Sequence, residues 1–121
     1  MGKEDYVSLE VAKMLKEKEF DIPCLSQYTR SGSIWNCQEP ENFNESEYCY
    51  SRPTLYEAQK WLRDTICIHI EIVYMYGNYW IYDLLTIPTH DLIGLTDKDN
   101  VKYESYEEAL SAGILEVLEL I

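Results

Sequence analysis

A segment near the middle of the chain alternates strictly between apolar and polar side chains, and this alternation limits the local fold to a β-strand. Residues 66–72 read ICIHIEI, so that four isoleucines are separated by Cys67, His69 and Glu71. Successive side chains of a strand point to opposite faces of the sheet, and the isoleucines therefore share one face. The following residues, 73–85, contain a Gly-Asn turn and a second apolar run, which predicts a β-hairpin.

The polarity of Asp83 selects the length of the hairpin loop. A two-residue loop would place Asp83 opposite Ile72 on the apolar face, where an unpaired carboxylate is costly. A three-residue loop, residues 76–78, instead pairs Ile72 with Tyr82. The asparagine at the last loop position tolerates the left-handed conformation that such loops require. We therefore expect Asp83 on the polar face, beside Glu71.

Capping residues predict where the three helices begin. The first helix is expected to begin near Ser8, a good N-cap residue. Thr54 and Glu57 have the spacing of a capping box at the start of the second helix, and Ser105 and Glu108 have the same spacing at the start of the third. A wide apolar stripe follows Ser105 to the last residue and predicts a buried helix face.

The remaining residues predict a second hairpin and two loops. Short extended stretches at 24–29 and 32–37 flank a turn. The acidic segment 38–48 contains four glutamates and no basic residue, and it is expected to be an exposed loop. Residues 88–100 are expected to form a second loop. Three of its apolar side chains are expected to return to the core: Leu92, Ile93 and Leu95.

These elements predict an α+β fold in one domain, residues 1–121. The expected order is α-β-β-α-β-β-α, with about four strands in an antiparallel or mixed sheet and helices covering one face, a two-layer sandwich. Gly113 lies in the middle of the last helix, where glycine costs about 1 kcal/mol relative to alanine. We therefore expect a close approach of this helix to the sheet or to another helix.

The charge balance disfavours one class of partner. The chain has 22 acidic and 10 basic side chains, which gives a formal net charge of −12. Such a surface repels phosphate backbones, so we expect no direct binding of nucleic acid. No apolar run reaches the roughly 18 residues of a membrane span, and the first residues, MGKEDYVSLE, lack the apolar core of a signal peptide. These features predict a cytoplasmic protein without membrane contact.

Cys67, His69 and Glu71 are residue types that bind metals or carry acid–base chemistry. A metal needs three or four converging ligands, and one strand supplies two at best. The four cysteines show no CxxC pair, and we interpret them as reduced and mostly buried thiols. Our interpretation is therefore a polar sheet face, with no catalytic residue, no metal and no cofactor. A small enzyme or metal-binding protein that uses Cys67, His69 and Glu71 is the alternative.

Exposed aromatic and acidic side chains are the candidate protein-binding residues. Interfaces are enriched in tyrosine and tryptophan, and the second hairpin is crowded with both. The aromatic candidates are Trp35, Tyr74, Tyr76 and Trp80. The acidic candidates, which would imitate the phosphates of a nucleic acid, are Glu39, Glu41, Glu45 and Glu47.

Several segments resemble a group of phage proteins. These segments are DYVSLEVAKMLKEKEFDIPC, PTLYEAQKWLRD with the IHI that follows it, and YESYEEALSAGILEVLELI. They resemble short uncharacterised proteins of phages, prophages and mobile elements from gut anaerobic bacteria. The resemblance implies an accessory phage protein inside a bacterial host cell, and it implies neither an activity nor any site residue.

Together these features predict a non-enzymatic protein that acts through protein–protein contact. The partner is unknown; a basic host protein, modulated by an acidic surface, is one form of this hypothesis. A self-assembling structural protein, in which copies of the chain form a homo-oligomer, is a further alternative.

Overall fold

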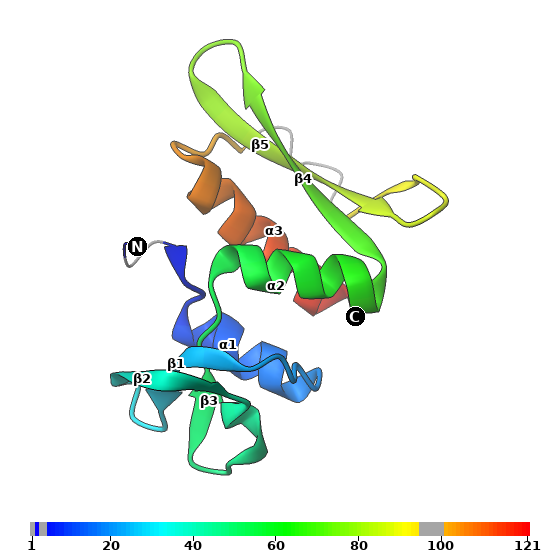
Figure 1. Cartoon of the computed structure of the whole chain (residues 1–121). Helices are drawn as coiled ribbons and strands as arrows, with labels where there is room; N and C mark the ends of the chain where they lie inside the picture. The colour runs from blue at the N-terminus through cyan, green and yellow to red at the C-terminus, as the bar shows by residue number, and fades with distance from the viewer. Residues whose placement is uncertain (1, 3–4, 95–100) are drawn as a thin grey trace. The chain divides into compact units, whose positions relative to one another are not determined.

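The computed structural model describes residues 2, 5–94 and 101–121 of the chain (Figure 1). It divides into two compact units, Met1–Ala58 and Gln59–Ile121, and the boundary falls inside helix α2 (Leu55–Trp61). Each unit contains helix and antiparallel sheet, which confirms the α+β class. The expectation of a single domain over residues 1–121 stays a prediction.

The first unit combines one helix with a three-stranded sheet in the order β2-β1-β3. Its elements are α1 (Leu9–Glu17), β1 (Cys24–Thr29), β2 (Ile34–Glu41), the short 3-10 helix η2 (Phe43–Glu45) and β3 (Cys49–Ser51). The Ser8 hydroxyl accepts a hydrogen bond of 3.2 Å from the Val11 N–H, which confirms the predicted start of α1. Val11 and Leu15 on the helix are buried.

The predicted loop at 38–48 was wrong over its first four residues, because β2 continues to Glu41. The pairing of β2 with β1 is irregular. Ser26 pairs with Asn36, whereas Cys24 pairs with Glu41, so extra residues of β2 bulge out of the ladder. Seven of the eight β2 residues are exposed, and such a strand has no buried face that an alternating pattern would reveal.

The second unit contains a second three-stranded antiparallel sheet, in the order β4-β5-β6. Its elements after α2 are the π-helical turn η3 (Leu62–Ile66), β4 (Ile68–Met75), β5 (Tyr79–Thr86), β6 (Leu92–Ile93) and α3 (Tyr106–Leu120). The prediction of about four strands in one sheet was therefore wrong: the described residues form six strands in two sheets. The two strands missed, β3 and β6, are three and two residues long, too short to show periodicity.

The predicted register of the β4–β5 hairpin is confirmed. Ile72 pairs with Tyr82, and Glu71 pairs with Asp83. The loop is three residues long, and the Asn78 N–H donates to the Met75 carbonyl at 3.2 Å. Asn78 has a φ of 65°, the left-handed conformation expected at this position.

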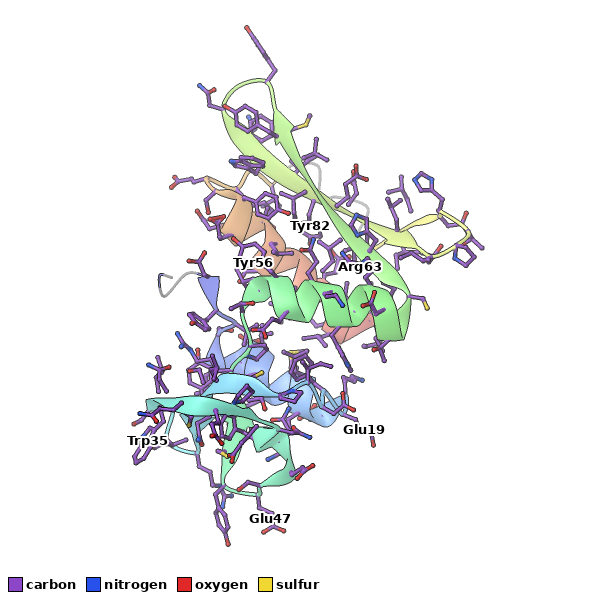
Figure 2. All side chains as sticks on the ribbon, viewed as in Figure 1. Glu19, Trp35, Glu47, Tyr56, Arg63 and Tyr82 are labelled. Carbon is purple, nitrogen blue, oxygen red and sulfur yellow. The ribbon has the colours of Figure 1, made fainter. Side chains whose placement is uncertain are left out.

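Helix α3 packs on the face of the hairpin that carries the isoleucines. The Ser105 hydroxyl accepts from the Glu108 N–H at 3.1 Å and caps the helix as predicted. A Cβ atom added to Gly113 would lie 2.7 Å from Ile70 Cγ2 and 3.3 Å from Tyr82. This close approach of helix and sheet is the predicted reason for Gly113. Figure 2 shows Tyr82 between the hairpin and α3.

The predicted return of the 88–100 loop to the core is wrong for Leu92, whose side chain is 68% exposed. Leu92 and Ile93 form β6 and pair with Leu85 and Leu84 of β5. Ile93 is half-buried. Leu95 lies outside the described residues.

The contact at Gly113 yields a test of how tightly α3 packs. Gly113→Ala should lower the free energy of unfolding by about 1–2 kcal/mol, because overpacking against Ile70 outweighs the better helix propensity of alanine. Urea denaturation measures this change. In an Ile70→Leu background, which lacks the Cγ2 methyl, the cost of Gly113→Ala should be smaller. A gain in stability from Gly113→Ala alone would contradict the close contact.

Candidate protein-binding surfaces

Four aromatic residues lie at the turn end of the β4–β5 hairpin, and we call them the aromatic end (Tyr74, Tyr76, Trp80 and Tyr106). Tyr74 and Trp80 are direct cross-strand partners, and their ring centroids are 4.8 Å apart. Trp80 also meets Tyr106, the first residue of α3, edge to face at 5.6 Å. Such ring pairs contribute about 0.5–1.5 kcal/mol beyond burial and hold the rings in defined orientations.

The aromatic end exists because the hairpin is longer than the helix that covers it. The turn end of the hairpin extends past the N-terminal end of α3 (Figure 1). Tyr74 lies on the same strand face as Ile70 and Ile72, yet its side chain is 55% exposed, and Tyr76 in the loop is fully exposed. The face that α3 buries further down the hairpin is therefore open to solvent at this end.

Residues before α3 support the aromatic end from the other edge of β5. The Trp80 N–H donates to the Tyr103 carbonyl at 2.8 Å, and the Tyr103 N–H donates to the Trp80 carbonyl at 3.0 Å. The Lys102 ammonium lies 4.9 Å from the centre of the Tyr79 ring, within the range of a cation–π interaction. The places of Tyr103 and Tyr106 beside the hairpin were not predicted, because no local sequence pattern reports contacts between segments so far apart in the chain.

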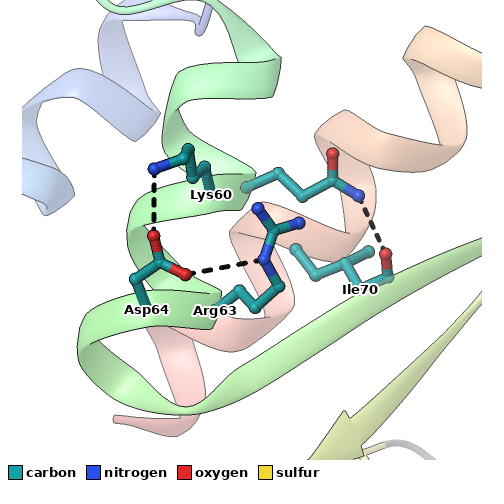
Figure 3. Close-up of polar contacts among 5 residues, drawn as sticks. Lys60, Arg63, Asp64 and Ile70 are labelled. Carbon is teal, nitrogen blue, oxygen red and sulfur yellow. Dashed lines mark hydrogen bonds and ion pairs between the residues drawn. The ribbon is translucent and has the colours of Figure 1, made fainter.

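The predicted acidic residues are all on the surface of the first unit. We call Glu39, Glu41, Glu45 and Glu47 the acidic surface; all four are exposed. In the described part of the chain, the ion pairs join Asp64 to Lys60 and Arg63, and none involves these glutamates (Figure 3). No lysine or arginine occurs between Arg30 and Arg52 in the sequence. The Lys16 ammonium of α1 reaches this segment but donates to the Ser46 and Cys49 carbonyls.

Trp35 belongs with the acidic surface and not with the aromatic end. It lies on β2, and its side chain is 62% exposed (Figure 2). Tyr48, between η2 and β3, is 68% exposed. The predicted aromatic candidates are therefore divided between the two units, with Trp35 in the first and the other three in the second.

The expected shared face of Cys67, His69 and Glu71 was wrong for Cys67. This residue precedes β4 and has a φ of 64°, which takes it out of the strand alternation. His69 Nδ1 is buried without a hydrogen-bond partner in the described residues, so no hydrogen bond to this atom fixes the imidazole as it would in a metal site. Among the residues that the structure describes, no three cysteine, histidine or acidic side chains come together as metal ligands.

A buried arginine is a feature that the sequence analysis did not identify. The Arg52 residue is only 5% exposed, and its guanidinium lies 3.9 Å from the centre of the Tyr6 ring and 5.5 Å from that of Tyr28. Its Nη1 donates to the Ser26 hydroxyl at 3.1 Å, while its Nε has no partner in the described residues. Stacking on aromatic faces lets an arginine remain buried without a carboxylate.

The four cysteines are free thiols, but the expectation that most are buried was wrong. Cys24 is buried, Cys37 and Cys49 are half-buried, and Cys67 is exposed. Burial, with a smaller contribution from the negative charge of Glu57, raises the pKa of the Cys24 thiol to about 12. Because the thiolate is the reactive form, Cys24 is inert at neutral pH.

Comparison with known proteins identified no relative of this chain. No protein-family model, no curated protein and no solved structure matches the chain. None of the described helices combines the length and the apolar character that a bilayer crossing requires.

Thiol labelling tests the packing around the cysteines. At pH 8 in native buffer, iodoacetamide should modify the exposed Cys67 readily and Cys24 hardly at all, because the Cys24 thiol stays protonated until the pH approaches its raised pKa. Peptide mass spectrometry after digestion locates the label. Protein unfolded in urea, in which all four thiols should react, is the control. Equal labelling of Cys24 and Cys67 in native buffer would contradict the buried environment.

Proposed function

We propose that the chain is a non-enzymatic protein-interaction module that binds its partner protein through the aromatic end. The resemblance to short phage and mobile-element proteins supports a setting for this function: an accessory protein in the cytoplasm of a bacterial host. A host protein is then the partner, and its activity is what the interaction modulates.

The observation that carries this proposal is the exposure of two tyrosine rings on a rigid support. Tyr74 and Tyr76 are exposed on a hairpin whose register, loop hydrogen bond and ring contacts are all in place. Tyrosines dominate interface energetics because they bury a large area at a small entropic cost. Preorganisation lowers the entropic cost of binding further, since the hairpin need not order on contact.

A tyrosine substitution tests the aromatic end. Tyr76→Ala should change the free energy of unfolding by no more than about 0.5 kcal/mol, because the ring is exposed. It should weaken partner binding about tenfold or more, the effect of removing an interface hot spot. Affinity capture from bacterial lysate, followed by mass spectrometry and a titration with the retained protein, measures both the partner and the affinity.

The matched control is Tyr48→Ala, which removes another exposed tyrosine, from the first unit. It should leave binding unchanged. Loss of binding with Tyr48→Ala but not with Tyr76→Ala would assign the interface to the first unit instead. If the bait retains no specific protein, the proposal of a host partner fails, and the size of the purified protein in solution then tests self-assembly.

A second candidate function is capture of a basic, nucleic-acid-binding protein by the acidic surface. Its support is the exposure of all four glutamates without a paired cation in the described residues. Fields from exposed charges extend about 10 Å at 0.1 M salt and only about 3 Å at 1 M. Binding by the acidic surface should therefore weaken steeply with salt, whereas binding by the aromatic end should persist.

Charge removal separates the two candidates. Replacing the four glutamates of the acidic surface with glutamine should abolish a salt-sensitive interaction and leave a salt-resistant one intact. Titrations at low and high salt measure both. The control removes the same charge from other exposed positions, by glutamine at Glu17, Glu19, Glu104 and Glu119. An equal loss of binding with both sets of substitutions would indicate a general effect of net charge rather than mimicry of nucleic-acid phosphates by the acidic surface.

A further inference from the structure

The outer edge of β4 is the feature that extends the proposed function. β4 is the terminal strand of its sheet, and in the described residues it pairs only with β5. A strand edge without a partner presents a row of N–H and C=O groups to which another strand can bind.

Backbone hydrogen bonds identify which residues of β4 present these N–H and C=O groups. In an antiparallel ladder, alternate residue pairs direct their backbone groups toward each other or away from each other. Trp80 directs its groups away from β4, because it exchanges both bonds with Tyr103, so its partner Tyr74 directs its own groups to the outer edge. By the same alternation, Ile72 and Ile70 also direct their backbone N–H and C=O groups to the outer edge of β4.

One bond confirms this assignment independently. The Gln59 side-chain amide donates to the Ile70 carbonyl at 2.9 Å, from outside the β4–β5 ladder (Figure 3). Gln59 thus occupies the edge at Ile70. The backbone groups of Ile72 and Tyr74, further toward the turn, lie on the part of the edge next to the aromatic end.

β4 has fewer of the devices that normally keep strand edges from pairing. β2, an edge strand of the first sheet, has a register break, a proline and two glutamates. β4 runs in unbroken register over eight residues, IHIEIVYM, without proline, lysine or arginine. Bulges, prolines and charged side chains disfavour edge pairing, so β2 is protected several times over, whereas β4 carries only the single charge of Glu71.

The charge on the two faces of β4 selects the chemistry of the incoming strand. On one face, Glu71 lies directly opposite Asp83, and neither is in an ion pair in the described residues. Like charges in this arrangement repel, and a lysine or arginine beside Glu71 would relieve the repulsion. On the other face, Ile72 and the exposed Tyr74 ring offer apolar contact.

We infer that β4 accepts an extended segment of the partner protein as an added strand, and that this segment alternates lysine or arginine with apolar residues. This inference rests on the proposed function and specifies its binding mode. The basic side chains lie beside Glu71, and the apolar ones beside Ile72 and Tyr74. A second copy of β4 would instead place an acidic strand next to Glu71.

Backbone amide hydrogen exchange by NMR tests the inference. The probe is a synthetic peptide that alternates lysine and valine; the control peptide replaces each lysine with glutamate. At a peptide concentration ten times Kd, exchange of the Ile72 and Tyr74 amides should slow about tenfold, because only the unbound fraction exchanges. The Val73 amide, which faces β5, should be protected both with and without the peptide. The glutamate peptide should have no effect.

A charge reversal supplies the second readout. Glu71→Lys should preserve folding, because Glu71 is exposed and the new lysine faces Asp83. It should abolish protection by the lysine peptide and introduce protection by the glutamate peptide. Glu119→Lys, the same charge change at an exposed position of α3, should leave the response to both peptides unaltered.

Three results would overturn the inference. The first is unchanged exchange at Ile72 and Tyr74 with millimolar lysine peptide. The second is an equal effect of the glutamate peptide on the unaltered chain. The third is protection of these amides in the free protein that grows with protein concentration, since a second copy would then occupy the edge. If partner capture still depends on Tyr76 in these cases, the proposed function stands and only the added strand is wrong.

Discussion

The register of the β4–β5 hairpin is the constraint on which the rest of the second unit depends. A three-residue loop pairs Ile72 with Tyr82 and keeps Asp83 off the face that α3 covers. Because side chains alternate with period two, a slip of one residue would bury the carboxylate and expose the isoleucines. The same register sets the outward direction of the backbone groups on β4, and hence the edge available for binding.

Packing of α3 on this hairpin is close because one helix position carries no side chain. Gly113 lets the helix backbone approach Ile70 and Tyr82, and the Tyr82 hydroxyl donates to the buried Glu116 at 2.5 Å. Burial, followed by the hydrogen bond and the charge of Glu116, raises the pKa of the Tyr82 hydroxyl, which keeps it a donor at any physiological pH. α3 therefore packs closely on this part of the hairpin, and the buried Tyr82 hydroxyl and Glu116 carboxylate are hydrogen-bonded to each other. The turn end of the hairpin, beyond the helix, is not covered in this way.

Among the described residues, the acidic groups other than Glu116 lie outside the core, and the buried Arg52 is held by aromatic rings. The acidic surface and the Glu71–Asp83 pair lack cationic partners in the described residues, whereas Arg52 lies between Tyr6 and Tyr28. Exposed charges without partners contribute little to stability, and they steer oppositely charged molecules toward the surface. This distribution of charge is the physical ground for the proposal of a basic protein partner.

Local sequence patterns determined the features that depend on neighbouring residues. The helix caps at Ser8, Thr54 and Ser105, and the β4–β5 register, follow from side-chain chemistry within a few residues, and all are confirmed. Only the tertiary structure decided the two-sheet arrangement, because β3 and β6 are too short to show a period. β3 pairs with β1, which precedes β2 in the chain, and β6 pairs with the preceding strand β5. The stacking of Arg52 likewise joins segments far apart in the chain, as does the contact of Trp80 with Tyr106. The open edge of β4 also depends on the tertiary structure, because it is the arrangement of the strands that leaves this edge unpaired. Burial and pairing of this kind arise from the packing of whole elements, which no local pattern of residues encodes.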